Sequence, residues 1–138
     1  MKIMNWQKAL EVVNFDPSLG VRMAPVTTDP IFRMFISEIL PGKKALAQYH
    51  YDGTEIYLIM QGSGILYTAT PVQDNTSCEN IKATEVIAGD CFNIYPGIAH
   101  QLENTGKKSL IFMFGCPVTH LSLDKVVVAD LAGASTFS

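Results

Sequence analysis

The sequence predicts an all-β fold, either a sandwich or a barrel. Short runs rich in Val, Ile, Phe and Tyr follow one another along the chain, separated by clusters of Gly, Pro, Asn or Asp. This is the pattern of short strands joined by turns. No helical segments lie between the runs, so a parallel sheet, which needs crossover helices, is not expected. The length of 138 residues is typical of one domain, and we expect a single domain over residues 1–138.

The expected strands follow in chain order. They cover Val21–Val26, Ile31–Leu40, Ala45–His50, Glu55–Met60, Gly64–Ala69, Ala83–Ile87, Cys91–Tyr95, Gln101–Asn104, Leu110–Phe114 and Lys125–Ala129. Turn-forming pairs such as Asp52–Gly53 and Pro96–Gly97 separate them. One short helix is expected at Trp6–Val13, from the spacing of its apolar residues. The polar stretch Val72–Asn80 is predicted to be an exposed loop.

The charge pattern argues against several classes of partner. The net charge is −3, and Lys and Arg gather only in isolated pairs, whereas nucleic-acid binding needs many phosphate contacts. No apolar run approaches the roughly 20 residues of a membrane span. Lys8 and Glu11 interrupt the segment where a signal peptide would be apolar. We therefore expect a cytoplasmic protein that binds neither nucleic acid nor membrane, with its three cysteines as free thiols.

A low content of charged residues suggests self-association. Charged residues make up 17% of the chain, compared with about 25% in ordinary soluble domains. A compact barrel with a large interior would explain part of this difference. The apolar run Ile31–Leu40 is expected to be an exposed edge strand, which would need to be covered. Together these features predict a homodimer.

Two segments contain the candidate metal ligands. Side chains alternate across a strand with period two, so Gln48 and His50 share a face. The pair Asp52–Gly53 can turn the chain and bring Glu55 beside His50. His100 follows a second turn and begins a later strand. Two His and one carboxylate from separate strands form a set that holds a divalent metal with coordination positions left open.

The spacing of these residues resembles the two motifs of the cupin superfamily. The motifs are G-x5-H-x-H-x3–4-E-x6-G and G-x5-P-x-G-x2-H-x3-N. In this chain they align on Gly42, Gln48, His50, Glu55 and Gly62 and on Gly89, Tyr95, Gly97, His100 and Asn104. The departures are Gln48 in place of the first His and Tyr95 in place of the Pro. The aligned residues lie within 42–104, just under half of the chain.

The resemblance implies an antiparallel jelly-roll barrel, often a homodimer, that holds a divalent metal (Fe, Mn, Ni or Zn). The aligned ligands are Gln48, His50, Glu55 and His100. An amide oxygen is a weaker donor than imidazole to a borderline transition metal. Three interpretations of Gln48 therefore stay open: a fourth ligand, a hydrogen-bond partner of a metal-bound water, or the mark of a member that has lost tight metal binding.

Two classes of function stay open. The first is a metal-dependent enzyme acting on a small organic molecule in the barrel. With Fe it would be a dioxygenase, and with Mn, Ni or Zn a Lewis-acid isomerase, lyase or cyclase in which Glu55, a water or Tyr57 handles protons. Tyr57 is also expected to line the pocket. The second is a binding or sensing protein without turnover, which the Gln48 departure favours. Fold alone does not decide between them.

His120 and Asn104 are expected to have structural roles outside the metal-ligand set. His120 follows both motifs and is expected to be a surface or otherwise hydrogen-bonded histidine, with a proton shuttle at the barrel mouth as the minor alternative. Asn104 is expected to bind backbone groups near the second motif.

Overall fold

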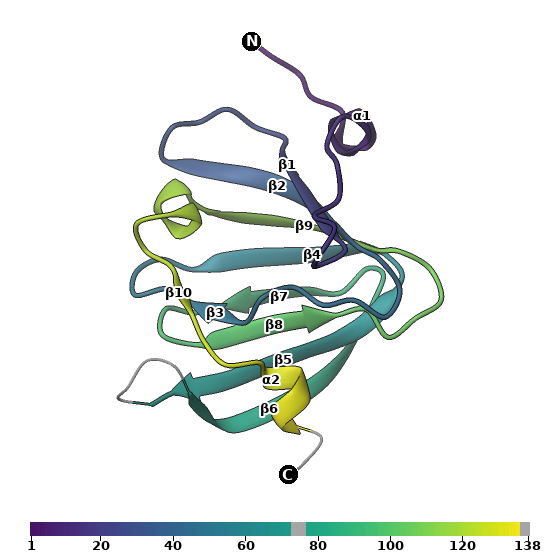
Figure 1. Cartoon of the computed structure of the whole chain (residues 1–138). Coiled ribbons are helices and arrows are strands. Elements are labelled where there is room, and N and C mark those ends of the chain that lie inside the picture. Colours follow the sequence, from purple (N-terminus) through teal and green to yellow (C-terminus); the bar gives the residue numbers. More distant parts are fainter. Residues whose placement is uncertain (73–76, 136–138) are drawn as a thin grey trace.

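The fold is built from two antiparallel sheets that face each other (Figure 1). The computed structural model describes residues 1–72 and 77–135. One sheet has the order β1 (Val21–Pro25), β2 (Phe32–Ile39), β9 (Leu110–Pro117), β4 (Glu55–Gln61), β7 (Cys91–Ile94). The other has the order β10 (Val126–Val127), β3 (Gln48–Tyr49), β8 (Ala99–Glu103), β5 (Ser63–Pro71), β6 (Cys78–Ile87). The predicted all-β antiparallel jelly-roll barrel is confirmed.

Helical segments are short and lie at the periphery of the sheets. They are α1 (Trp6–Glu11), the 3-10 helix η1 (Val118–Leu121) and α2 (Leu131–Ser135). The side chain of Asn5 caps α1 by accepting a hydrogen bond from the Lys8 N–H at 3.1 Å. The helix ends two residues before the predicted boundary at Val13. No helix among the described residues is both long enough and apolar enough to cross a membrane.

Several predicted strand bounds differ from the structure; for example, only Val126–Val127 of the expected Lys125–Ala129 is strand. Only Gln48–Tyr49 of the expected Ala45–His50 is strand, because ladder pairing there is limited to β8 and the two-residue β10. β6 begins at Cys78, so the end of the expected loop Val72–Asn80 is strand, while residues 73–76 lie outside the described part of the chain. The earlier start follows from pairing of Cys78 with Pro71 at the end of β5.

The space between the sheets holds an apolar core. It includes Phe35, Ile39, Ile59, Leu110 and Phe112, all nearly inaccessible to solvent. The opposite face of β9 packs with α1 through a second apolar cluster. Both faces of β9 are therefore covered, which explains why this run is apolar at nearly every position.

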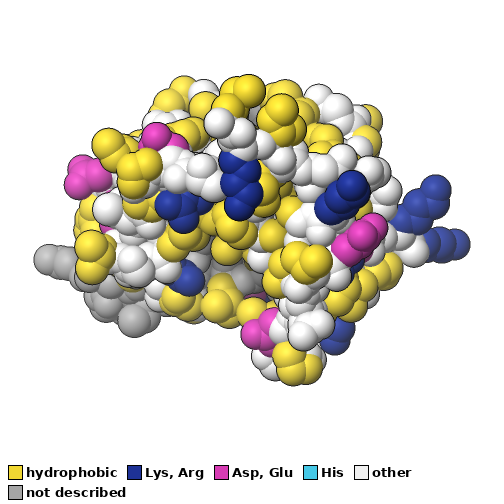
Figure 2. Space-filling model, turned by 90° about the horizontal axis from the view of Figure 1, so that it is seen from above, with side chains coloured by type: hydrophobic (Ala, Val, Ile, Leu, Met, Phe, Trp, Pro, Cys, Tyr) yellow, Lys and Arg dark blue, Asp and Glu magenta, His cyan; other side chains and the backbone are white. Residues whose placement is uncertain are grey.

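The expected edge strand is not at an edge. β2, which covers most of Ile31–Leu40, lies between β1 and β9. The edge-strand argument for a homodimer is therefore wrong, because β1 already pairs with this strand. Figure 2 shows the molecule from the end where α1 lies, with hydrophobic side chains spread between scattered Lys and Arg. Ile31 and Phe32 are among the exposed large hydrophobic residues.

Asn104 has the structural role predicted for it. Its side-chain amide donates to the carbonyl oxygens of Ile39 and Lys108, each at 2.8 Å, and its oxygen accepts from the N–H of Gly106 at 2.9 Å. The side chain is completely buried. It thus satisfies backbone groups that would otherwise be unpaired at the end of the second motif.

Candidate metal centre

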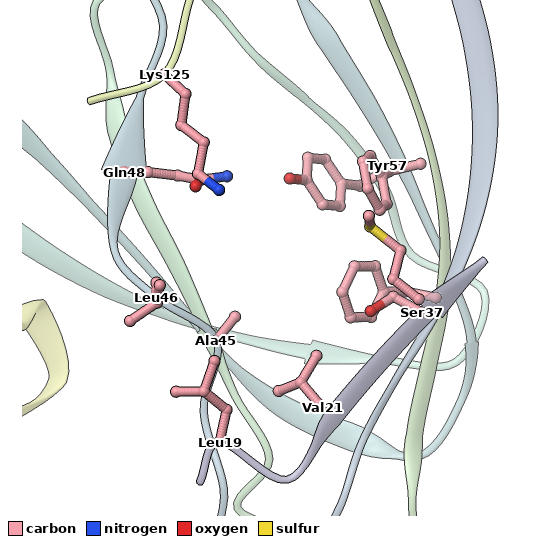
Figure 3. A pocket seen from close by; sticks show the side chains of 11 residues that line it. Leu19, Val21, Ser37, Ala45, Leu46, Gln48, Tyr57 and Lys125 are labelled. Atoms are coloured by element: carbon pink, nitrogen blue, oxygen red, sulfur yellow. The ribbon is translucent and has the colours of Figure 1, made fainter. Parts of the chain in front are cut away.

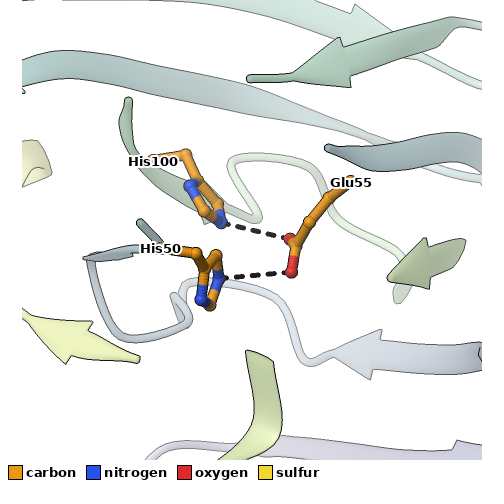
Figure 4. A group of neighbouring side chains, drawn as sticks. All are labelled: His50, Glu55 and His100. Carbon is orange, nitrogen blue, oxygen red and sulfur yellow. Dashed lines mark ion pairs between the residues drawn. The ribbon is translucent and has the colours of Figure 1, made fainter. Parts of the chain in front are cut away.

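Three buried side chains from three parts of the barrel meet at one point (Figure 4). His50 directly follows β3, Glu55 begins β4 and His100 lies in β8. Nε2 of His50 is 3.2 Å from Oε2 of Glu55, and Nε2 of His100 is 3.4 Å from Oε1. Each residue is at most 5% exposed. The structure thus brings together three of the four aligned ligand residues around a single carboxylate.

The local chain conformation explains this convergence. Gly53, with φ +84°, forms the turn that reverses the chain between His50 and Glu55, a backbone conformation that a residue with a side chain rarely adopts. The N–H of Gly97 donates to the carbonyl oxygen of His50 at 2.7 Å. The turn before His100 is therefore hydrogen-bonded directly to the first motif, so the two motifs are held in a definite relation.

The hydrogen bonds of the two histidines determine which nitrogen faces the carboxylate. Nδ1 of His50 is bonded to the carbonyl oxygen of Asp124, and Nδ1 of His100 to that of Ile98. A carbonyl can only accept, so each Nδ1 carries the hydrogen and each neutral ring presents a lone pair at Nε2. Within the described part of the chain, these two Nε2 atoms are the buried side-chain atoms without a hydrogen-bond partner.

This arrangement fits a divalent cation. Two nitrogen lone pairs that face a carboxylate would repel it, and a buried polar atom without a partner carries a desolvation cost. A metal ion between the three groups would remove both penalties. Imidazole nitrogens and a carboxylate are ligands that Fe, Mn, Ni and Zn accept.

The electrostatics keep the carboxylate ionised. Burial by itself would raise the pKa of Glu55, but in the metal-free site His100 and His50, when protonated at Nε2, and the Tyr57 hydroxyl outweigh it, so the pKa lies well below its ordinary value. Burial and the Glu55 charge together raise the pKa of Tyr57 well above 10. Burial would lower the pKa of His50, yet Glu55 and the Asp124 carbonyl raise it overall. Glu55 is thus a ready ligand, and Tyr57 keeps its proton.

The third histidine of the chain also belongs to this site. Nδ1 of His120 in η1 lies 2.8 Å from Oε2 of Glu55, and Nε2 is hydrogen-bonded to the carbonyl oxygen of Asp52. Its ring stacks on His50, with centroids 3.9 Å apart and an angle of 3°. The expected surface position is wrong, because His120 is 2% exposed, whereas the hydrogen-bonded alternative is confirmed. Its position after both motifs offered no signal of this contact.

Asp124 supports the same part of the site. Its carboxylate accepts hydrogen bonds from the backbone N–H groups of Tyr51 and Asp52, at 2.6 and 2.9 Å. Its carbonyl oxygen accepts from His50. Such outer contacts orient metal ligands and select their tautomer. The segment after β9 therefore holds the turn between His50 and Glu55 from outside.

A second group of potential ligands shares Glu55. It adds Cys116 and His120, whose ligand atoms lie within 4.8 Å of the carboxylate and of each other. Burial, and then the nearby Glu55 charge, raise the pKa of Cys116 to about 12. The thiolate is the form that binds metal. The group of His50, Glu55 and His100 is therefore the better candidate.

A cavity lies beside Tyr57, which contacts the candidate metal centre, and Figure 3 shows the side chains that line it. It has a volume of about 270 Å³, and Gln48, Tyr57, Phe112 and Lys125 are among its lining residues. The Tyr57 hydroxyl donates to Oε1 of Glu55 at 2.7 Å, so one residue contacts both the cavity and the candidate ligand. Gln48 is directly opposite His100 in the pairing of β3 with β8. Tyr57 thus lies between the cavity and the metal centre, and Gln48 lines the cavity from the strand position opposite His100.

Solved structures show similar folds. A conserved protein with a double-stranded beta-helix domain from Klebsiella pneumoniae is similar over 94% of this chain and 99% of its own, with a TM-score of 0.70 at 16% identity. A predicted oxalate decarboxylase from Thermotoga maritima has a TM-score of 0.67 at 20% identity, over 84% of this chain and 98% of its own. An oxalate oxidase has a TM-score of 0.62 at 20% identity, over 75% of this chain and 53% of its own.

Comparisons of the sequence gave one negative and one positive result. A search of curated protein sequences found no significant match. The family model described as Cupin matches residues 31–126, which is well over half of the chain and includes both motifs. On that match, supported by the antiparallel double sheet, this chain belongs to the cupin family.

Proposed function

We propose that this protein is a metal-dependent enzyme that acts on a small organic molecule bound beside Tyr57. The observation that carries the proposal is the pair of buried, unpartnered Nε2 atoms of His50 and His100 that face Glu55. The proposed ligands are these three residues, with Gln48 as a fourth and weaker one.

The chain's own residues suit a reaction in the cavity. The metal would supply dioxygenase chemistry if it is Fe, or polarisation of a substrate carbonyl or carboxyl group if it is Mn, Ni or Zn. Glu55 holds its negative charge at the metal centre, while Tyr57 holds a proton at its hydroxyl and lines the cavity. We therefore propose Glu55 and Tyr57 as the catalytic residues, with Tyr57 positioned to exchange a hydrogen bond with Glu55 for one with a bound substrate.

The alternative is a binding or sensing protein without turnover. The observation that favours it is Gln48 at the position where the family pattern has a histidine. A site with three strong ligands and one weak one would hold metal less tightly. Oxygen uptake by the iron-loaded protein, together with a screen for conversion of small carbonyl and carboxyl compounds, separates turnover from binding alone.

The first test is metal content. Protein purified without a metal-affinity tag is expected to contain one divalent metal ion per chain by elemental analysis. His50→Ala and His100→Ala should lose the metal while circular dichroism shows the fold retained, because each removes one of the converging nitrogens. Unchanged metal stoichiometry in both variants would refute the proposed site.

The chain provides a matched control for Glu55. Glu103 accepts a hydrogen bond from the Tyr67 hydroxyl at 2.7 Å, as Glu55 does from Tyr57. Neither metal-ligand group found in the structure includes Glu103. Glu55→Gln should therefore reduce metal content, and Glu103→Gln should leave it unchanged. Equal losses in the two variants would point to general destabilisation in place of a specific site.

We also propose that the protein forms a homodimer and lies in the cytoplasm. A homodimer stays a prediction, supported by the low charged content and by exposed hydrophobic residues such as Ile31 and Phe32. Light scattering at micromolar concentrations tests it, and a mass near 15.1 kDa would exclude the dimer. A cytoplasmic location and the absence of nucleic-acid and membrane partners likewise stay predictions from the charge pattern.

A further inference from the structure

The cavity beside the metal centre has a polar end and an apolar end (Figure 3). Lys125 and Gln48 project into it from one wall, and the Tyr57 hydroxyl points toward them from the opposite wall. Away from these groups, the lining is apolar except for the hydroxyl of Ser37, and it includes Leu19, Val21, Ala45 and Leu46. The cavity therefore offers hydrogen-bond donors at one end and apolar contacts at the other.

The strand pairing explains why Lys125 is at the polar end. β10 pairs with β3 so that Val127 is opposite Gln48. Lys125 lies two positions before Val127, and side chains two apart in an extended segment share a face. The same backbone pairing thus places a cation and an amide side by side within the barrel mouth.

The charge of Lys125 has no partner in the described part of the chain. No ion pair there involves Lys125, although Lys44 pairs with Asp130 and Arg22 with Glu38. The neighbouring carboxylate of Asp124 is instead occupied by the N–H groups of Tyr51 and Asp52. The ammonium group is therefore available to an anion that enters the cavity.

We propose that the cavity binds a small monocarboxylate with an apolar body, held by Lys125 at the carboxylate and by Val21 and Leu46 along the body. The proposal rests on the proposed function in taking this cavity as the substrate site. The Lys125 ammonium and the N–H groups of the Gln48 amide suit a carboxylate's acceptor-only oxygens, and the Tyr57 hydroxyl becomes a third donor when it turns from Glu55 to the ligand. The apolar end has no charged side chain, and its one hydroxyl, that of Ser37, already donates to the carbonyl oxygen of Arg22 at 3.2 Å. At about 270 Å³ the space suits a compact ligand.

The test compares an acid with its neutral amide. 3-Phenylpropionate and 3-phenylpropanamide have the same apolar body and differ in charge, and isothermal titration calorimetry measures their affinities. Lys125→Met should weaken binding of the acid by about tenfold or more, the loss expected for a charge-assisted hydrogen bond. Lys125→Arg should retain most of the affinity, and the amide should bind wild type and Lys125→Met equally. Lys108→Met is the control, because Lys108 does not line the cavity.

A second comparison tests the apolar end. Leu46→Ala should weaken 3-phenylpropionate several-fold relative to wild type and leave the weaker binding of acetate unchanged. The proposal is overturned if wild type shows no saturable binding of 3-phenylpropionate, if the amide binds as tightly as the acid, or if Lys125→Met binds the acid like wild type.

Repeating the titrations with chelator-treated protein separates this proposal from the metal-dependent enzyme. If the purified protein proves to bind no metal but still binds the acid through Lys125, the cavity assignment is supported and the metal proposal fails. If the protein binds metal but its affinity for the acid does not depend on Lys125, the metal proposal stands and the cavity assignment is wrong.

Discussion

His50 and His100 face the same carboxylate but are held by different parts of the chain. Nδ1 of His100 is bonded to the carbonyl of Ile98, two residues away, whereas Nδ1 of His50 is bonded to the carbonyl of Asp124, 74 residues away. The two carboxylate oxygens of Glu55 differ in the same way. Its Oε1 accepts from Tyr57 on the same strand, and its Oε2 contacts His120, 65 residues away.

The site therefore has two differently supported sides. The His100 side comprises His100 and Oε1 of Glu55, positioned by neighbours in sequence. The His50 side comprises His50 and Oε2, positioned by the segment after β9. We infer that the His100 side forms with its own strands, while the His50 side needs the C-terminal segment to pack against the barrel. Variants in that segment should affect the two sides unequally.

The largest effect is expected at His120. His120→Ala removes both the contact with Oε2 of Glu55 and the ring stacked on His50. Loss of an outer partner of metal ligands typically weakens affinity about 10–100-fold. His120→Asn should retain part of the affinity, because its amide can occupy the position of Nδ1. Chelator competition measures the order wild type, His120→Asn, His120→Ala.

Tyr57→Phe provides the corresponding change on the His100 side. It removes the hydroxyl bond to Oε1 and keeps the ring packed against Phe92 and Phe114. Its effect on metal affinity should be smaller than that of His120→Ala. A larger effect would mean that the His100 side, and not the His50 side, limits the orientation of Glu55.

Asp124→Ala should have a more moderate effect confined to the His50 side. It removes the acceptor of two backbone N–H groups in the turn, which should lower the free energy of unfolding by about 1–3 kcal/mol. Metal affinity should fall roughly tenfold. NMR of the imidazole rings should show His50 shifted and His100 nearly unchanged.

Asp130→Ala is the matched control for Asp124→Ala. Asp130 also lies in the C-terminal segment and accepts hydrogen bonds from Lys44 and Gln101, yet it makes no contact with the metal centre. It should lower stability without changing metal affinity. If both variants weaken metal binding equally, the difference between the two sides does not exist.

Gln48 lies between the two sides, two residues from His50 and opposite His100. Gln48→His should tighten binding of Zn or Ni several-fold, because imidazole is the better donor to these metals. Gln48→Ala should weaken binding less than His50→Ala does. Chelator competition ranks the variants. Should Gln48→His bind no more tightly than wild type, Gln48 does not point at the metal.

The smallest effect concerns pH in the metal-free protein. The pKa of Glu55 lies below its ordinary 4.5, so its contribution to stability is present above pH 4.5 and lost as pH falls. The pKa of His50 lies above its ordinary 6.5, so its contribution is present below pH 6.5 and lost as pH rises. Urea unfolding with chelator should show the largest stability difference between wild type and Glu55→Gln from pH 4.5 to 6.5. A pH-independent difference would contradict these pKa shifts.

The residues of the His100 side and the three aligned ligands could be predicted from sequence. Strand period and turn residues are local properties, so they indicate that Gln48 shares a face with His50 and that Glu55 returns beside it. The antiparallel all-β fold followed from the same local signals. The sequence by itself therefore determined the fold class and the side chains that converge as candidate ligands.

Only the tertiary structure decided what surrounds those ligands. His120, Asp124 and Lys125 lie in a segment without motif spacing, and they reach the site because η1 follows β9 and β10 pairs with β3. The same is true of β2, which sequence alone placed at an edge and which β1 covers in the structure. The physical reason is that contacts across 65 or more residues depend on how the chain closes, and no local periodicity carries that information.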